Sequence, residues 1–194
     1  FDAVRGIDVE ERLSALSGTA TLESYAHWFD EEARKQLGTK WDTIARAMNI
    51  PNAVNLRVNT LKSSEENVLI ELNNAGLEVQ PHPVFDKALV LKGRPRLNNL
   101  EGFKTGRFEV QDAGSQSIAP FLNPKPGSTV IDACAGAGGK TLHLGALMKN
   151  DGKLIAMDVE GRKLGELLKR TQRSGLTIVQ TRAWEEPGVL DELS

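Results

Sequence analysis

A glycine-rich loop that directly follows an apolar run and opens a helix is the most constraining feature of this 194-residue chain. The loop reads Asp132-Ala-Cys-Ala-Gly-Ala-Gly-Gly-Lys-Thr141, after the apolar run Ser128-Thr-Val-Ile131. Glycines let the backbone approach a ligand closely, and the free N–H groups at the start of a helix favour negative charge. A second acid, Asp158, ends the next predicted strand. An acid at that place in a doubly wound sheet binds the ribose hydroxyls of an adenosine-type cofactor, so the sequence predicts a nucleotide pocket.

The segments around the loop alternate between strand and helix patterns. They predict the order βαβαβ, which is the first half of a doubly wound parallel sheet. The expected elements are a strand at 128–134, a helix from about 139 to 149, a strand at 153–158, a helix at 161–173 and a strand at 177–181. In the second helix the residues expected to face the sheet are Leu164, Leu167, Leu168 and Thr171.

The first half of the chain predicts a different architecture. Residues 1–50 form a helical region, in which 31–48 carries apolar residues at helical intervals. A strand at 54–60 follows, then a helix capped by Ser63 or Ser64 and ended by Gly76, and strands at 77–80 and 88–91. We therefore expect a small α+β module at 51–110 and a partial nucleotide-binding domain at 111–194.

Two common nucleotide-binding patterns do not fit the glycine loop. A P-loop ATPase needs a glycine five residues before Gly139, where this chain has Cys134. A dinucleotide-binding fingerprint needs a glycine where this chain has Thr141.

Cysteine and histidine usage limits the metal and redox chemistry. Cys134 is the single cysteine, so an internal disulfide or a cysteine-based zinc site is excluded. His27, His82 and His143 lie in separate segments, and we expect surface or capping roles and no metal site. No apolar run approaches the length of a membrane span, and the pattern favours a soluble, cytoplasmic protein with no membrane contact.

The net charge of −2 conceals a basic stretch at residues 87–107. This stretch holds six bases and one acid, Glu101. A local excess of this kind attracts phosphates, although a solvated basic loop explains it equally well. The bases are Lys87, Lys92, Arg94, Arg96, Lys104 and Arg107.

Three motifs in the right order resemble one known family. The glycine loop, the segment Phe108-Glu-Val-Gln-Asp-Ala-Gly-Ser-Gln116 and the segment Leu56-Arg-Val-Asn-Thr60 are together similar to the RNA cytosine-C5 methyltransferases of the Fmu/Sun and Nop2 type, with bacterial 16S ribosomal RNA enzymes the nearest in pattern. The family loop commonly has Pro where this chain has Ala137. The resemblance implies an α/β fold with the first half of a Rossmann-like class I methyltransferase sheet, preceded by an RNA-recognition-like α+β module and N-terminal helices.

The resemblance also implies S-adenosyl-L-methionine as cofactor and RNA, expected to be ribosomal, as partner. Asp132 would border the cofactor pocket, Asp158 would hold the ribose, Lys163 would neighbour the cofactor, and Glu185 would approach the adenine, with Trp184 against the base. The loop residues implied to surround the cofactor are Cys134, Ala135, Gly136, Ala137, Gly138, Gly139 and Lys140. The residues expected to contact RNA are Arg57, Lys92, Arg94, Arg96, Lys104 and Arg107.

Some of these residues have a second interpretation. Asp132 would alternatively cap the glycine turn by accepting backbone N–H bonds. Cys134 matches the chemistry of a nucleophile, but its place at a strand end favours a small buried residue. Gln111, Asp112 and Ser115 would form either the edge of the cofactor pocket or a turn.

In this family the catalytic cysteines lie on later strands, in segments that this chain does not contain. The sequence is therefore interpreted as part of a longer enzyme, with the catalytic cysteines expected beyond Ser194 and the segment alone inactive. Without later strands, residues 129–131 would form an apolar edge, and we expect self-association. The alternatives left open are an RNA-binding module with a vestigial nucleotide fold and a P-loop-like ATPase.

Overall fold

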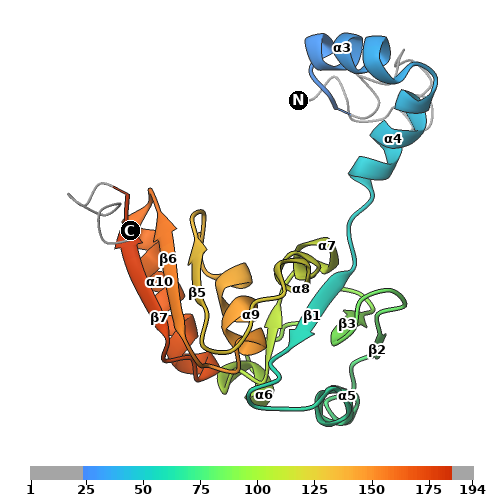
Figure 1. Ribbon diagram of the computed structural model, residues 1–194. Helices are drawn as coiled ribbons and strands as arrows, with labels where there is room; N and C mark the ends of the chain where they lie inside the picture. Colours follow the sequence, from blue (N-terminus) through green and yellow to red (C-terminus); the bar gives the residue numbers. More distant parts are fainter. Residues whose placement is uncertain (1–23, 185–194) are drawn as a thin grey trace, which may run out of the picture. The chain divides into compact units, whose positions relative to one another are not determined.

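A computed structural model describes residues 24–184 of the chain (Figure 1). The chain divides into two compact units, Phe1–Asn52 and Ala53–Ser194. The described part of the first unit is helical, and the second unit contains two β-sheets.

The first unit contains two helices, α3 (His27–Leu37) and α4 (Lys40–Asn49). This agrees with the helical region predicted for residues 1–50, in which the apolar spacing at 31–48 spans parts of both helices. Gly38 adopts a φ of +56°, a left-handed value that ends α3 before α4 begins. The indole Nε1 of Trp41 donates a 2.6 Å hydrogen bond to buried Asp30, which ties the two helices together.

An antiparallel sheet opens the second unit, with the strand order β2-β3-β1-β4. Ser64 caps the helix in this part, because its Oγ accepts a hydrogen bond from the Asn67 backbone N–H. The strand Phe108–Val110 pairs with β1 and forms one edge of this sheet, inside the bounds of 51–110 predicted for the module. The elements are β1 (Val54–Val58), α5 (Glu65–Asn74), β2 (Val79–Pro81), β3 (Ala88–Leu91), α6 (Glu101–Lys104) and β4 (Phe108–Val110).

Both faces of β1 are buried. Leu56 and Val58 pack with α5 and Phe108 in the largest apolar core cluster. The alternate residues Asn55 and Arg57 are polar and are also buried. A strand with one apolar and one polar face normally leaves the polar face in water, so something must cover this one.

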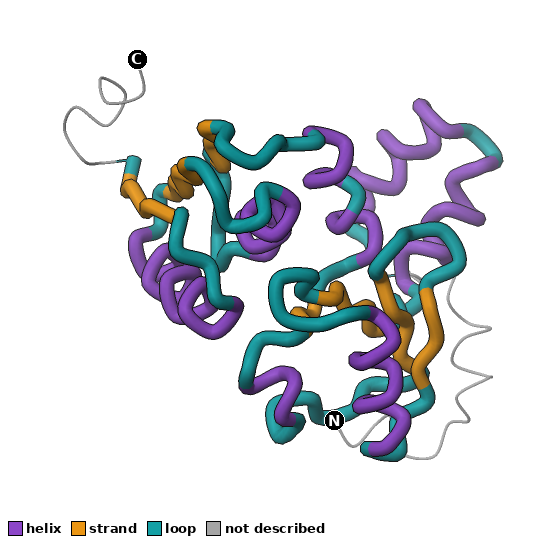
Figure 2. The backbone as a smooth tube through the Cα atoms, turned by 60° about the horizontal axis from the view of Figure 1, so that its bottom comes forward, coloured by secondary structure: helices purple, strands orange, loops and turns teal. Residues whose placement is uncertain are grey.

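A parallel sheet of order β5-β6-β7 completes the second unit, and Figure 2 shows the strands of the two sheets as separate groups. This confirms the predicted βαβαβ order, and the bounds differ from prediction by a few residues at the ends. Two short helices, α7 (Ala113–Gln116) and α8 (Ile118–Leu122), precede it. Its elements are β5 (Thr129–Asp132), α9 (Gly139–Leu147), β6 (Lys153–Asp158), α10 (Gly161–Ser174) and β7 (Val179–Ala183).

Helix α10 packs through most of the side chains predicted to face the sheet. Leu164, Leu167 and Thr171 are buried, whereas Leu168 is 42% exposed and was wrongly included. Gly175 ends the helix with a φ of +81°. Within residues 24–184 no helix has the length and apolarity needed to span a membrane.

Candidate functional site

The carboxyl ends of β5 and β6 lie next to each other, because the strands pair in parallel with Asp132 opposite Ala156. The glycine loop, residues 133–138, leaves the end of β5 here and leads into α9. The Ala135 N–H donates to the Met157 carbonyl at 2.9 Å, which keeps the start of the loop against β6. Both strand-end acids and the loop are therefore brought together, as the sequence predicted.

Asp158 holds the glycine loop directly. Its Oδ2 accepts a 2.8 Å hydrogen bond from the Gly136 N–H, and its Oδ1 accepts a 2.9 Å bond from the Glu160 N–H. These backbone hydrogen bonds lower the pKa of Asp158 below its ordinary value, and the bond from Glu160 has the larger effect. The carboxylate is charged at neutral pH and fixed in orientation before any ligand arrives.

Asp132 has a different partner. Its Oδ2 accepts a 2.7 Å hydrogen bond from the Thr141 hydroxyl in the first turn of α9. The alternative that Asp132 caps the turn through backbone N–H groups finds no such bond in the described residues. Asp158 has that role in the structure.

Cys134 is exposed, and the interpretation of this residue as small and buried is wrong. It lies two residues beyond the last residue of β5, in a loop that no described element covers. Lys140 is also exposed and forms no ion pair within the described residues. Both side chains are therefore free to meet a ligand.

Two further predicted residues lie near the strand ends. Lys163, in the first turn of α10, forms an ion pair with Glu160, which raises the pKa of Lys163. The Trp184 indole Nε1 donates to the Ala133 carbonyl at 3.1 Å, and its backbone N–H donates to the Asp158 carbonyl at 3.3 Å. Trp184 therefore lies beside the loop, whereas Glu185 lies outside the described residues.

The residues expected to contact RNA differ in accessibility. Arg57 is 2% exposed, and its Nε donates to the Gln111 Oε1 at 2.7 Å, so Arg57 does not belong to a surface that binds RNA. Arg57 lies on a face of the antiparallel sheet that other parts of the protein cover, where a phosphate group cannot reach it. The expectation that Arg57 contacts RNA is therefore wrong. Lys92 is paired with Glu78 and Arg107 with Glu71.

The remaining bases of this set are exposed and have no ion pair within the described residues: Arg94, Arg96 and Lys104. Arg96 lines an open pocket of about 420 Å³ with two asparagines, Asn98 and Asn99, and with apolar residues that include Val54 and Val110. This pocket combines a cation, amide groups and aliphatic walls.

The segment Phe108–Gln116 places one side chain, that of Gln111, close to the start of α9. The Gln111 Nε2 lies 3.8 Å from the position that a Cβ on Gly139 would take. Asp112 instead caps α7 by accepting the Ser115 N–H, so for Asp112 and Ser115 the turn-forming interpretation describes the structure.

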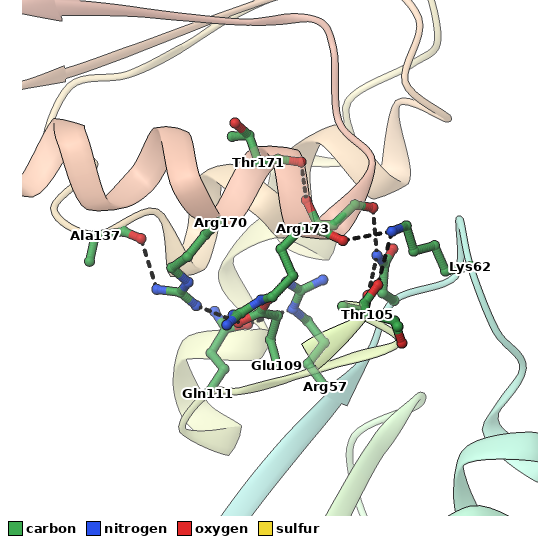
Figure 3. A network of polar contacts seen from close by, with 12 residues as sticks. Arg57, Lys62, Thr105, Glu109, Gln111, Ala137, Arg170, Thr171 and Arg173 are labelled. Atoms are coloured by element: carbon green, nitrogen blue, oxygen red, sulfur yellow. Dashed lines mark hydrogen bonds and ion pairs between the residues drawn. The ribbon is translucent and has the colours of Figure 1, made fainter. Parts of the chain in front are cut away.

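Sequence reasoning missed the residues that join the two sheets (Figure 3). Glu109 of β4 is 2% exposed and forms ion pairs with Arg170 at 2.9 Å and Arg173 at 2.7 Å, both from α10. A single acid between two apolar residues in Phe108-Glu-Val110 was the available signal, because a charged residue in a short strand is seldom buried without a partner.

Histidine placement is partly as predicted. His82 is a capping residue, since its Nδ1 accepts the Val84 and Phe85 N–H groups. His27 lies at the surface beside Glu31. His143 is neither, because it is half-buried in α9, and burial together with the nearby Arg57 lowers its pKa to about 3.

Two family models match the chain. Residues 25–98 match the ferredoxin-like domain of RsmF/B-like methyltransferases, and residues 119–188 match the model described as 16S rRNA methyltransferase RsmB/F. A relative from Bacillus subtilis, a probable ribosomal RNA small subunit methyltransferase B, is 32% identical over 95% of this chain and 40% of its own length. The ribosomal RNA small subunit methyltransferase B of Citrobacter koseri is 32% identical over 83% of this chain and 38% of its own. The chain thus spans about two fifths of the length of the curated relatives it matches.

Solved structures share the fold. A methyltransferase homologue from Pyrococcus horikoshii superposes with a TM-score of 0.77 at 30% identity, over 92% of this chain and 60% of that one. NSun6 from the same organism, solved with SFG, gives a TM-score of 0.78 at 20% identity, over 84% of this chain and 66% of that one. These likenesses place the parallel sheet among the class I methyltransferase sheets.

Proposed function

Because the chain belongs to the RsmB/F family of 16S rRNA methyltransferases, we propose that it takes part in S-adenosylmethionine-dependent methylation of cytosine C5 in ribosomal RNA. The observation that carries this proposal is the contact between Asp158 and the Gly136 N–H. It joins the acid of the second parallel strand to the glycine loop of the first, at the edge of the sheet where nucleotides bind in this fold class.

The loop and Asp158 fit the cofactor chemically. An ionised carboxylate offers about four acceptor positions, of which two are used by the Gly136 and Glu160 N–H groups. The remaining positions suit the two hydroxyls of a ribose. We assign residues 134–140 to the methionine and ribose portion, with Asp132 supporting the first turn of α9 through Thr141.

The adenine is assigned to the side of the site where Trp184 lies. Its position beside Ala133 and Asp158 supports this, because an indole offers a flat face to a base. Lys163 and Glu185 are proposed as further neighbours of the cofactor. When bound, S-adenosylmethionine would supply the methyl group.

RNA guidance is assigned to the α+β module, residues 51–110, with residues 1–50 as a helical region before it and residues 111–194 as the cofactor part. One face of its sheet is buried through Asn55, Arg57 and Glu109, so RNA contacts must come from its loops and edges. The exposed cations Arg94, Arg96 and Lys104 support such a path, together with Lys92 and Arg107. Single-stranded RNA suits it, because the unstacked bases offer their edges to amide groups.

The reaction needs a thiolate that adds to C6 of cytosine and so makes C5 nucleophilic toward the methyl group. Cys134 lies on the loop that we assign to the cofactor. Its thiol is therefore placed beside the methyl donor and not beside C6 of the cytosine. We propose that the catalytic cysteines come from outside residues 1–194. On this proposal the chain binds the cofactor and RNA but does not methylate RNA by itself.

The experiment is calorimetric titration of the chain with S-adenosylmethionine, with Asp158→Ala as the test variant. Asp151→Ala is the matched control, because Asp151 precedes the amino end of the same strand, β6, and forms no hydrogen bond through its side chain within residues 24–184. We expect binding by the wild-type chain and by Asp151→Ala, and its loss in Asp158→Ala. Equal binding by all three proteins, or none by the wild type, would contradict the assigned site.

A further inference from the structure

The side chain of Arg170 connects the glycine loop to the antiparallel sheet (Figure 3). Its Nη1 donates a 2.8 Å hydrogen bond to the Ala137 carbonyl, and its Nη2 forms a 2.9 Å ion pair with the Glu109 carboxylate. One guanidinium thus contacts the loop between β5 and α9 and a strand 61 positions away in sequence.

The glycine loop needs contacts of this kind to keep one conformation. Gly136 and Gly138 flank Ala137 with φ values of +54° and +90°, and glycines lose more backbone freedom on ordering than other residues. Asp158 holds the Gly136 N–H, and Leu167 packs so closely against Gly138 that an added Cβ would lie 2.7 Å from its Cγ. The Ala137 carbonyl is held by Arg170.

Arg170 is in turn held by a buried carboxylate. Glu109 is 2% exposed, and its two oxygens are shared between Arg170 and Arg173. Arg170 reaches this carboxylate through Nη2 alone and the Ala137 carbonyl through Nη1, and these two bonds together fix the plane of its guanidinium. The end of α10 is fixed as well, because the Lys62 Nζ donates to the Arg173 carbonyl at 2.6 Å and the Asn59 Nδ2 donates to the Ser174 carbonyl at 2.9 Å.

We propose that Arg170 is a positioning residue for the glycine loop and that Glu109, a residue of the RNA-guiding module, holds the Arg170 side chain in place. The inference rests on the cofactor role proposed above for residues 134–140. It makes cofactor affinity depend on β4, a strand that does not border the nucleotide pocket. Ordering of the module and ordering of the cofactor loop are then coupled through one side chain.

Two arginines of α10 provide the test and its matched control. Arg170→Met removes the contact with Ala137 and one ion pair with Glu109. Arg173→Met removes the other ion pair with Glu109 and leaves the loop contact intact. Each variant removes a partly exposed arginine of α10 that pairs with Glu109. If Arg170 only stabilised the fold, the two variants would therefore have similar effects on the loop.

The first readout is amide hydrogen exchange over residues 133–142 in the unliganded chain. The second is the dissociation constant for S-adenosylmethionine by calorimetry. Arg170→Met should speed exchange in the loop and weaken cofactor binding, each by about tenfold, a typical size for coupling between sites. Arg173→Met should lower the melting temperature but leave both readouts within about twofold of the wild type.

A milder variant keeps the test valid if Arg170→Met does not fold. Arg170→Lys retains the charge but presents one compact ammonium that cannot span both partners, and it should give a smaller change in the same direction.

Unchanged exchange in both Arg170 variants, or an equal increase in Arg173→Met, would overturn the proposal. The exchange experiment needs no cofactor. If the wild-type chain bound no S-adenosylmethionine, the cofactor assignment would fail, while loop exchange would still decide whether Arg170 positions the loop.

Discussion

Arg57 on β1 and Glu109 on β4 are direct partners in the antiparallel register, and each is only 2% exposed. They lie on the sheet face from which Glu109 contacts α10 through its two arginines. Burial lowers the pKa of Arg57 to about 10, with Glu109 opposing the change. The polar face of this sheet is therefore an internal contact with α10 of the parallel-sheet part.

Removal of the Glu109 charge should destabilise the chain severely. Glu109→Gln leaves Arg57, Arg170 and Arg173 without their shared carboxylate, and an uncompensated buried charge costs about 3 kcal/mol or more. Glu166→Gln removes the acid of an exposed pair with Lys169 and should cost less than about 1 kcal/mol. Urea unfolding measures both, and similar midpoints for the two variants would disprove the importance of the buried cluster.

The close approach of Gly106 to α10 should make it intolerant of a side chain. An added Cβ would lie 2.3 Å from the Arg173 carbonyl oxygen, at a φ of +71°. Gly93 has nearly the same φ, +73°, with nothing within 4 Å, and therefore isolates the conformational strain.

We expect Gly93→Ala to cost about 1 kcal/mol and Gly106→Ala about 3 kcal/mol, since only the second adds a clash with backbone. Thermal unfolding of the two variants gives the comparison. A Gly106→Ala protein as stable as Gly93→Ala would mean that α10 does not lie against Gly106.

His143 should contribute a loss of stability in mild acid. Its pKa is lowered to about 3 by burial and by Arg57, from an ordinary value of 6.5. The unfolded histidine therefore takes up a proton below about pH 6.5, while the folded one stays neutral until about pH 3. Stability is highest above pH 6.5 and falls as the pH drops through this window, by on the order of 2 kcal/mol between pH 7 and pH 5.

His143→Leu should remove that part of the pH dependence, as measured by urea unfolding at pH 7 and pH 5. NMR titration of the wild-type imidazole provides a direct check. A His143 resonance that titrates near pH 6.5 would contradict the burial seen here.

RNA binding should respond to Arg96 more than to Lys92. Arg96 has no acidic partner in the part of the chain described here, whereas Lys92 is 2.7 Å from Glu78 and already partly neutralised. With a single-stranded RNA oligonucleotide, Arg96→Gln should reduce the slope of log affinity against log salt by about 1.

Lys92→Gln is the control and should change this slope less. Fluorescence anisotropy at several salt concentrations measures both. Equal slopes for the wild type and Arg96→Gln would remove Arg96 from the RNA path.

Local signals in the sequence predicted most of the fold. Ser64 and Gly76 bound α5 through a side-chain cap and a left-handed residue, and both effects act within a few residues. The β6 strand begins and ends as predicted, because a continuous apolar run between a turn and an acid has few alternatives. The glycine loop and Asp158 likewise meet because parallel strands end at a common edge.

Predictions that depended on long-range packing were less successful. Leu56 and Val58 of β1 are buried, as apolar residues of a strand usually are, but Arg57, which was expected to contact RNA, is buried as well. Its burial depends on α10, which lies more than a hundred residues later. Cys134 was expected to be buried for a similar reason, since a strand end is usually covered, and the described elements leave it open.

The sequence by itself therefore determined the order of the elements, the glycine loop and the strand-end acid, because caps, turns and apolar periodicity are short-range effects. The tertiary structure decided which charged residues are buried and how the loop is held. Glu109 and Arg170 are 61 positions apart, and nothing local to either residue specifies the other. Their contact exists because two sheets pack with α10 between them, where a buried charge is stable only beside a partner of opposite charge.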